Sequence, residues 1–180
     1  KFRIESARLK SWDYSWPAWY YVTIVVAGRS CVFGEIQGDE VVLNPLGQAT
    51  DASWQEIPKH HQDVELDGHI VMPNHIHGIV ILNDTGSRTD VGRRSRDVQL
   101  NVSTKALMSP KKGSLSIVVR TFKAVTAWAR RNGHRGFRWQ GRFHDHIIRD
   151  ENDLHRIRKY IFNNPLQWAL DEENPENVQR

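Results

Sequence analysis

Two apolar segments joined by a short turn, residues 64–72 and 75–82, constrain the fold of this chain more than any other feature. The first, VELDGHIVM, and the second, HIHGIVIL, are strand-length runs rich in Val, Ile and Leu. Between them lie Pro73 and Asn74, which are typical turn residues. A turn this short joins antiparallel strands, because parallel strands need a long crossover. The segments therefore predict two antiparallel strands, and the more apolar second strand is expected in the middle of a sheet.

The remaining segments predict further strands and several helices. Strands are expected at residues 19–26, 31–36, 41–43 and 143–148, and helices at 45–57, 115–131 and 151–164. Asn44 and Asp150 are the expected N-caps of two of these helices. Hairpin-length turns join several strands, so the sequence favours an α+β fold in which helices cover an antiparallel sheet of about five strands.

The composition indicates one domain and excludes several classes of protein. The length fits a single domain spanning 1–180, with a polar, basic and possibly mobile insertion at about 83–113. Cys31 is the only cysteine, which excludes a disulfide framework and a cysteine-based zinc site. No apolar run approaches the roughly 18 residues of a membrane span. These features predict a cytoplasmic protein without a membrane partner.

Positive charge is concentrated in the middle of the chain. Residues 83–113 carry seven Lys or Arg against three Asp, and residues 114–149 carry eight against one, whereas both ends are net acidic. Such a block is typical of a surface that binds a polyanion, and the alternative is a solvated Arg-rich surface. The candidate nucleic-acid contacts are Arg120, Lys123, Arg130, Arg131, Arg135, Arg138 and Arg142.

His75 and His77 are candidate metal ligands. Alternate residues of a strand share a face, so both imidazoles are expected on one side of the sheet and Ile76 on the other. Two imidazoles at this spacing can chelate one divalent metal ion. Alternate histidines on a strand are also common as plain surface residues, so the pair alone leaves both interpretations open.

Tyr160 and Asn164 form a second candidate group near the end of the last helix. At about 100° per residue they lie roughly 40° apart, flanking the apolar stripe of Ile157 and Ile161. Both side chains are therefore expected at the edge of the buried face, where they meet the sheet and remain accessible. The alternative is structural, because a tyrosine at such an edge often packs its ring and hydrogen-bonds its hydroxyl.

The sequence resembles the single-tyrosine HUH transposases, and within them the REP-associated tyrosine transposases and their insertion-sequence relatives. The resemblance runs from about Trp12 to the C-terminus and is poor over 84–113. It depends on three features in the family's order: the His-hydrophobic-His strand within 64–82, the strand FHDHIIR at 143–149, and a Tyr-x-x-x-Asn helix end before Pro165.

The resemblance implies a ferredoxin-like HUH nuclease sandwich and a role for each of these residues. It assigns the metal-binding pair to His75 and His77, the nucleophile to Tyr160 and a third, polar metal ligand to Asn164, where some relatives have Gln. His146 is a candidate for a residue that orients the metal ligands without contacting the metal. The alternative is a hydrogen-bonded histidine of the sheet. The implied metal is Mg²⁺ or Mn²⁺.

The implied activity is transposition: cleavage and transfer of single-stranded DNA through a 5′-phosphotyrosine intermediate. The expected partner is single-stranded DNA that carries a hairpin, and a homodimer is left open. Two alternatives remain: a nucleic-acid-binding protein of the same fold with lapsed transposition activity, and a small metallohydrolase without a covalent intermediate. The presence of His75, His77, Tyr160 and Asn164 together favours the enzyme.

Overall fold

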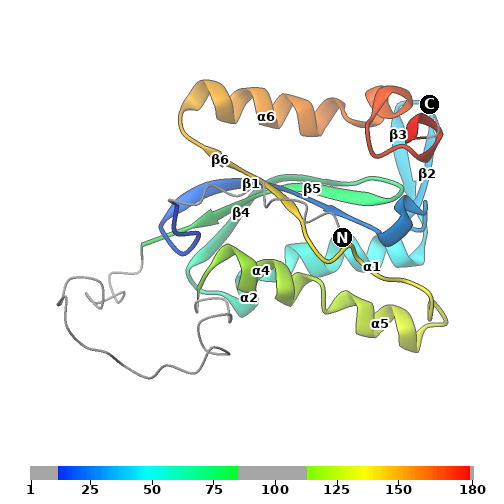
Figure 1. The fold of residues 1–180 in the computed structure, drawn as a ribbon, viewed down its shortest axis with the longest axis horizontal. Coiled ribbons are helices and arrows are strands. Elements are labelled where there is room, and N and C mark those ends of the chain that lie inside the picture. The colour runs from blue at the N-terminus through cyan, green and yellow to red at the C-terminus, as the bar shows by residue number, and fades with distance from the viewer. Residues whose placement is uncertain (1–11, 85–112, 179–180) are drawn as a thin grey trace, which may run out of the picture.

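A computed structural model describes residues 12–84 and 113–178, and a four-stranded antiparallel sheet runs through its middle (Figure 1). The strands, in the order in which they lie side by side, are β4 (Val64–Val71), β5 (His75–Leu82), β1 (Ala18–Val25) and β6 (His144–Ile148). β5 is an inner strand, as its apolar sequence predicts, and all of its residues are buried.

Two further strands, β2 (Gly34–Gln37) and β3 (Glu40–Leu43), form a hairpin of their own. The main sheet therefore has four strands rather than about five. The strand expected from residue 31 begins only at Gly34, because the preceding backbone bonds elsewhere. The amides of Val32 and Phe33 both donate to the carbonyl of Pro73, and the Phe33 ring is buried in the core.

One face of the sheet is covered by α1 (Pro45–Gln55), α2 (Ile57–His60), α4 (Leu115–Phe122) and α5 (Val125–Arg131) (Figure 1). The side chain of Asn44 caps α1 as predicted, accepting from two backbone amides. The single helix expected at 115–131 is divided, because the Ala124 amide bonds only three residues back, to Thr121, in a tight turn. Its predicted apolar stripe is nevertheless buried on both sides of the break.

The other face of the sheet is covered by α6 (Glu151–Asn163) (Figure 1). Asp150 caps this helix as predicted, accepting from the Asp153 amide at 2.8 Å. Its apolar stripe packs on β5 through a cluster of Leu154, Ile157, Ile161, Ile79 and Ile81. Burial of each such side chain contributes about 1.5–3 kcal/mol, so the stripe holds α6 over the sheet.

The chain ends in short helical segments that turn back from α6 toward the hairpin. These are the 3₁₀ turn η2 (Pro165–Leu170), which contacts β3, and the helix α7 (Pro175–Val178). A third short segment, the 3₁₀ turn η1 (Ala27–Arg29), follows β1. The C-terminal segments therefore lie at the end of the sheet where β5 begins (Figure 1).

Two glycines allow close packing around helix α1. A Cβ atom on Gly78, in the middle of β5, would lie 2.2 Å from the ring of Trp54. A Cβ atom on Gly47 would lie 2.1 Å from the carbonyl oxygen of Phe33. Glycine at position 47 weakens the local preference for helix. It is nevertheless required there, because any side chain would collide with the Phe33 backbone against which α1 packs.

The segment expected as an insertion, 83–113, falls almost entirely outside the described residues. Among the helices that the structure does describe, none has the length and apolar character needed to cross a membrane.

Candidate active site

β5 presents His75 and His77 on the sheet face that α6 covers. Ile79 and Ile81 of the same strand pack against α6, whereas Ile76 belongs to the core on the opposite face. Strand alternation therefore places both imidazoles on one face, as expected. Both histidines are buried, so this candidate metal-binding pair lies between two layers of the protein and not on a free surface.

Hydrogen bonds determine which nitrogen of His75 carries its proton. The Nδ1 atom lies 2.8 Å from the side-chain oxygen of Asn74. The side-chain nitrogen of Asn74 donates to the carbonyls of Arg29 and Glu173, so its oxygen must be the atom that faces the imidazole. Because an amide oxygen only accepts, His75 carries its proton on Nδ1 and keeps a lone pair on Nε2.

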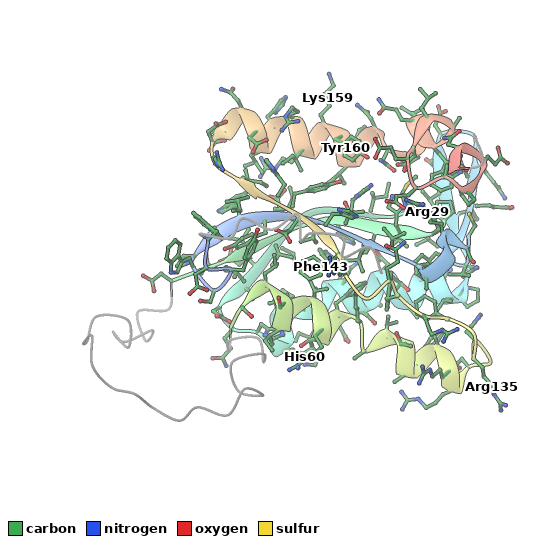
Figure 2. The ribbon with its side chains drawn as sticks, viewed as in Figure 1. Arg29, His60, Arg135, Phe143, Lys159 and Tyr160 are labelled. Carbon is green, nitrogen blue, oxygen red and sulfur yellow. The ribbon has the colours of Figure 1, made fainter. Side chains whose placement is uncertain are left out.

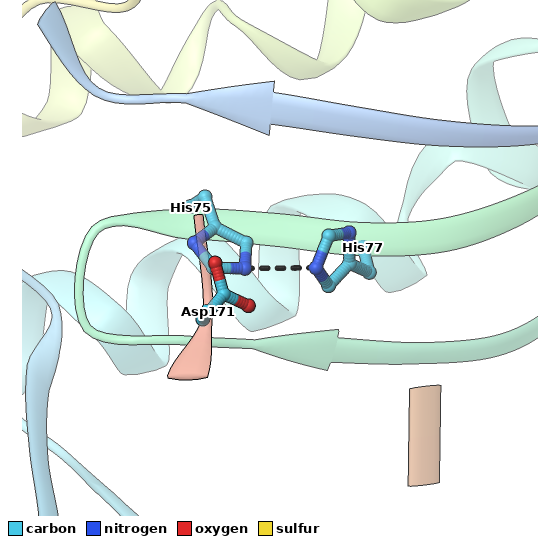
Figure 3. Close-up of side chains that lie close together, drawn as sticks. All are labelled: His75, His77 and Asp171. Atoms are coloured by element: carbon cyan, nitrogen blue, oxygen red, sulfur yellow. Dashed lines mark hydrogen bonds between the residues drawn. The ribbon is translucent and has the colours of Figure 1, made fainter. Parts of the chain in front are cut away.

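The two imidazoles turn their Nε2 atoms toward each other at 2.9 Å (Figure 3). On its other side, His77 Nδ1 lies 2.7 Å from the hydroxyl of Tyr21 and 2.9 Å from that of Thr23. Burial lowers the pKa of His75 to about 4. Burial, and secondly the charge of His75, lowers the pKa of His77 well below its usual range. Both rings are neutral near pH 7, which is the form that binds a metal.

Asp171, just after η2, brings a carboxylate to the histidine pair (Figure 3). One oxygen of Asp171 and one nitrogen from each of His75 and His77 all lie within 4.8 Å of one another. Asn164 stands beside this group, and its side-chain nitrogen lies 3.3 Å from Asp171 Oδ2. The C-terminal segment therefore adds oxygen donors to the two imidazole nitrogens, and the donors lie close enough together to bind one metal ion.

The side-chain oxygen of Asn164 supports a metal at this place. Asn164 is 1% exposed, and its Oδ1 atom is buried without a hydrogen-bond partner among the described residues. A buried acceptor without a partner costs about 1–3 kcal/mol, unless an ion or water satisfies it. Two neutral imidazoles, a carboxylate and an unsatisfied amide oxygen fit a divalent cation. The donor set is thus chemically suited to a metal.

Tyr160 lies on α6 beside these groups, and 41% of its surface is exposed. Its ring centroid is 5.3 Å from that of His77 and 6.3 Å from that of Tyr21. Burial is the main cause of a raised pKa of Tyr160, the charge of Asp171 raises it further, and a hydrogen bond with Asn164 lowers it. The structure therefore brings together the four residues predicted from the sequence: Tyr160, Asn164, His75 and His77.

His146 lies on β6 at the other end of α6, and its Nε2 atom is 2.6 Å from a carboxylate oxygen of Asp153. This bond joins the edge of the sheet to the first turn of α6. The hydrogen bonds described for His75 and His77 go to other partners. A supporting role for His146 at the metal site thus stays a prediction.

The basic residues expected to contact DNA lie on or after α4 and α5, in the layer across the sheet from α6. Figure 2 shows Arg135 and Tyr160 on opposite sides of the molecule. Lys123 differs from its neighbours because it is half-buried and donates to the carbonyl of Gln140 at 2.7 Å. Burial lowers the pKa of Lys123 to about 8. The exposed members are Arg120, Arg130, Arg131, Arg135, Arg138 and Arg142.

Sequence reasoning missed three residues that contact the site: Asp171, Tyr21 and Thr23. The polar side chains of Tyr21 and Thr23 alternate within the apolar strand β1, and this pattern was the one available signal. Their contact with His77 depends on the register of β1 against β5, in which Thr23 stands opposite His77. Asp171 is one of three consecutive acidic residues, and no local pattern indicates that it returns to the sheet.

Comparison with known proteins finds a relative that is similar in sequence and a solved structure that is similar in fold. No family model matches it. An uncharacterized protein of Haemophilus influenzae is 36% identical over 172 residues, covering 93% of this chain and 91% of that protein. A solved structure of a REP-associated tyrosine transposase bound to a REP hairpin is 18% identical, with a TM-score of 0.55 over 91% of this chain and 74% of that one. The chain belongs to one family with the Haemophilus influenzae protein, and it has the tyrosine transposase fold that its sequence predicts.

Proposed function

We propose that this protein is a metal-dependent DNA transposase that cleaves and transfers single-stranded DNA, with Tyr160 as its nucleophile. The observation that supports it most is the convergence of a half-exposed tyrosine with a buried donor set. Tyr160 packs beside His77, and Asn164, one helical turn later, leaves its side-chain oxygen unsatisfied. A tyrosine in a purely structural role would not need two buried imidazoles and a carboxylate beside it.

Each residue of the site has a distinct task in the proposed reaction. His75, His77, Asp171 and Asn164 hold a divalent ion, Mg²⁺ or Mn²⁺, which when bound offsets the negative charge that develops on the scissile phosphate. The Tyr160 oxygen attacks phosphorus, and the bond from phosphorus to the 3′-oxygen breaks. Tyr160 gives up one proton and the leaving 3′-oxygen takes one up, so the products are a 5′-phosphotyrosine and a free 3′-hydroxyl. One phosphodiester bond replaces another, and the strand can therefore be rejoined.

The raised pKa of Tyr160 gives the site a further requirement. A phenol with a pKa above its ordinary value of 10 holds its proton near neutral pH, so that proton must leave as the oxygen attacks phosphorus. Asn164 counteracts this effect of burial, because its hydrogen bond lowers the pKa of Tyr160. We assign Asn164 two tasks: it supplies an oxygen to the metal and it orients the nucleophile from the next turn of α6.

The proposed substrate is single-stranded DNA with a hairpin. The solved transposase of the same fold was bound to a REP hairpin, and the exposed arginines on and after α5 supply positive charge for a DNA backbone. These arginines lie across the sheet from Tyr160, so they hold the strand at a distance from the chemistry. Phosphate contacts of this kind position DNA without reading its sequence.

The test is incubation of the protein with end-labelled single-stranded hairpin DNA and Mg²⁺ or Mn²⁺, followed by a denaturing gel. A metal-dependent band that migrates as protein plus DNA, and that protease treatment removes, is the expected result. A binding protein with lapsed chemistry shifts DNA on a native gel but yields no such band. A metallohydrolase without a covalent intermediate shortens the DNA and leaves none of it attached to protein.

A further inference from the structure

We propose that Tyr21 is a positioning residue: its hydroxyl accepts the Nδ1–H of His77 when a metal is bound and directs its own proton to the Tyr160 oxygen. The inference rests on the proposed function, in which Tyr160 is the nucleophile. It links one metal ligand to the nucleophile through a single hydroxyl on β1. Neither the sequence resemblance nor the donor set assigns Tyr21 a role.

Without a metal, the hydrogen bonds around His77 leave one consistent arrangement. His75 keeps its proton on Nδ1 for the Asn74 oxygen, so its Nε2 atom is an acceptor. His77 Nε2, 2.9 Å away, must then be the donor. His77 Nδ1 is left as an acceptor for the hydroxyls of Tyr21 and Thr23, at 2.7 and 2.9 Å.

A metal ion held by His75 and His77 would change this arrangement. His77 would lose the proton on Nε2 to solvent and take one up on Nδ1, so the ring would stay neutral and its tautomer would switch. The Nδ1–H then needs an acceptor in a buried place, and the oxygens of Tyr21 and Thr23 are the two within reach. A metal-bound histidine generally donates its other N–H in this way, and the partner fixes the orientation of the ring.

Tyr21 differs from Thr23 because it also meets the nucleophile. The two tyrosine rings pack edge to face at 6.3 Å. Burial is the main cause that raises the pKa of Tyr21, and a side-chain hydrogen bond with Tyr160 is among the further causes. When His77 Nδ1 becomes a donor, the Tyr21 hydroxyl no longer donates a hydrogen bond to that nitrogen. It can then donate its proton in a hydrogen bond to the Tyr160 oxygen. That bond holds the oxygen in place and stabilises the negative charge that the oxygen carries once its own proton has left.

Because Thr23 also contacts His77, the bond of Tyr21 to His77 and its bond to Tyr160 can be tested separately. Tyr21→Phe leaves Thr23 to accept from His77, so metal binding should survive, while the hydroxyl that donates to the Tyr160 oxygen is lost and the ring packing is kept. Thr23→Val removes the other acceptor of the His77 Nδ1–H and leaves Tyr21 in both tasks. The double variant removes both acceptors of the His77 Nδ1–H. Tyr20→Phe is the matched control, because Tyr20 is the preceding residue of β1 and its hydroxyl donates to the Trp16 carbonyl on the opposite face.

The tautomer is measured by NMR of ¹⁵N-histidine-labelled protein with and without Zn²⁺, a diamagnetic probe that imidazole binds well. The His77 signals are assigned from the spectrum of His77→Gln. We expect the His77 proton on Nε2 without Zn²⁺ and on Nδ1 with it. The double variant should bind Zn²⁺ about 10- to 100-fold more weakly than Tyr21→Phe. A His77 proton already on Nδ1 without metal, or equal Zn²⁺ affinities, would overturn the link to His77.

The link to Tyr160 is measured as the rate of covalent adduct formation at saturating DNA and metal. Tyr21→Phe should slow this step about 10- to 100-fold with unchanged DNA affinity, whereas the control Tyr20→Phe should match the wild type. A Tyr21→Phe rate equal to the wild-type rate would overturn the role of Tyr21 at the nucleophile. Absence of any adduct from the wild type would instead refute the proposed function, and the NMR result would still decide whether Tyr21 serves His77.

Discussion

At the scale of single residues, burial keeps the two imidazoles of the site neutral. His75 and His77 are enclosed between the sheet and the segments that follow α6, and desolvation is the first cause of the lowered pKa of both. For His75 the charge of Glu173 works in the opposite direction, but desolvation outweighs it. Each ring therefore offers a lone pair at neutral pH, where a solvent-exposed histidine would be partly protonated.

This burial predicts a pH dependence of stability in the metal-free protein. The pKa of His75 is about 4 in the folded state and 6.5 ordinarily, so the unfolded chain binds more protons between these values. The stabilising effect is present above pH 6.5 and is lost as the pH falls toward 4. From pH 7.5 to 5.0, His75 should contribute a loss on the order of 2 kcal/mol in the free energy of unfolding.

Urea unfolding of the wild type and of His75→Gln at both pH values measures this contribution. The variant lacks the titrating group, so its stability should change less than that of the wild type. All other titrating groups are common to both proteins and cancel in the comparison. An equal change in the two proteins would show that His75 is readily protonated in the folded state.

His77→Ala should abolish cleavage while DNA affinity changes little, because in the proposed site the imidazole supplies one metal bond.

The donor set predicts a separate effect of Asp171 on the metal. Asp171→Asn removes the negative charge next to His75 and His77, so Mn²⁺ affinity should fall at least about tenfold. Glu172→Gln is the matched control for Asp171→Asn, since Glu172 is the exposed neighbour of Asp171. Mn²⁺ binding by titration calorimetry should be unchanged in that control, and equal loss in both variants would remove Asp171 from the metal site.

At the scale of elements, β5 sets the geometry of the site and Gly78 sets the position of β5. The strand carries both histidines on one face and contacts Trp54 of α1 on the other, where a Cβ atom at Gly78 would lie 2.2 Å from the indole ring. The indole is buried against the sheet and cannot move away without disturbing the core. A shift of helix α1 would therefore be passed through β5 to the two histidines on its other face.

Gly78→Ala should destabilise the protein by about 1–3 kcal/mol through overpacking and should weaken metal binding by displacing β5. Gly68→Ala is the control, because Gly68 lies on the paired strand β4 and a Cβ atom there would meet nothing within 4 Å. Urea unfolding gives the first effect and Mn²⁺ titration the second. If both variants lose the same stability, the contact with Trp54 is not the cause.

The elements also show why part of the site could be predicted from the sequence. Strand alternation and helix periodicity are local, and they suffice to place His75 and His77 on one face and Tyr160 and Asn164 at one helix edge. Asp171 reaches the histidines only because the chain turns back after α6, and Tyr21 only because of the register of β1 on β5. Such contacts depend on tertiary packing, which no local spacing encodes.

At the scale of the whole molecule, the sheet separates two layers of different character. The layer of α6 and the C-terminal segment contains the site, and the layer of α4 and α5 carries exposed arginines (Figure 2). If DNA contacts both layers, it passes around an edge of the sheet. The two layers then contribute separately to the reaction, one to affinity and one to chemistry.

Replacing Arg130, Arg131, Arg135 and Arg138 together by Ala tests this separation. Single strands release counterions with a slope of about −0.7 in log affinity against log salt per phosphate contact, so losing two to four contacts should flatten the slope by roughly 1.4 to 2.8. Affinity should fall for all DNA sequences alike, and adduct formation at saturating DNA should be unchanged. An unaltered slope would make these arginines a solvated face and place the DNA path on the side of α6.

The most direct test of the account is to identify the residue that carries DNA after the reaction. The chain has four tyrosines, and each is changed singly to Phe before incubation with hairpin DNA and metal. Nuclease and protease digestion of the wild-type adduct, followed by mass spectrometry, should yield a nucleotide-linked peptide that contains Tyr160. Tyr160→Phe should form no adduct while binding DNA with wild-type affinity, and Tyr14→Phe and Tyr20→Phe should still form it. An undiminished adduct from Tyr160→Phe, or a nucleotide on any other residue, would contradict the account.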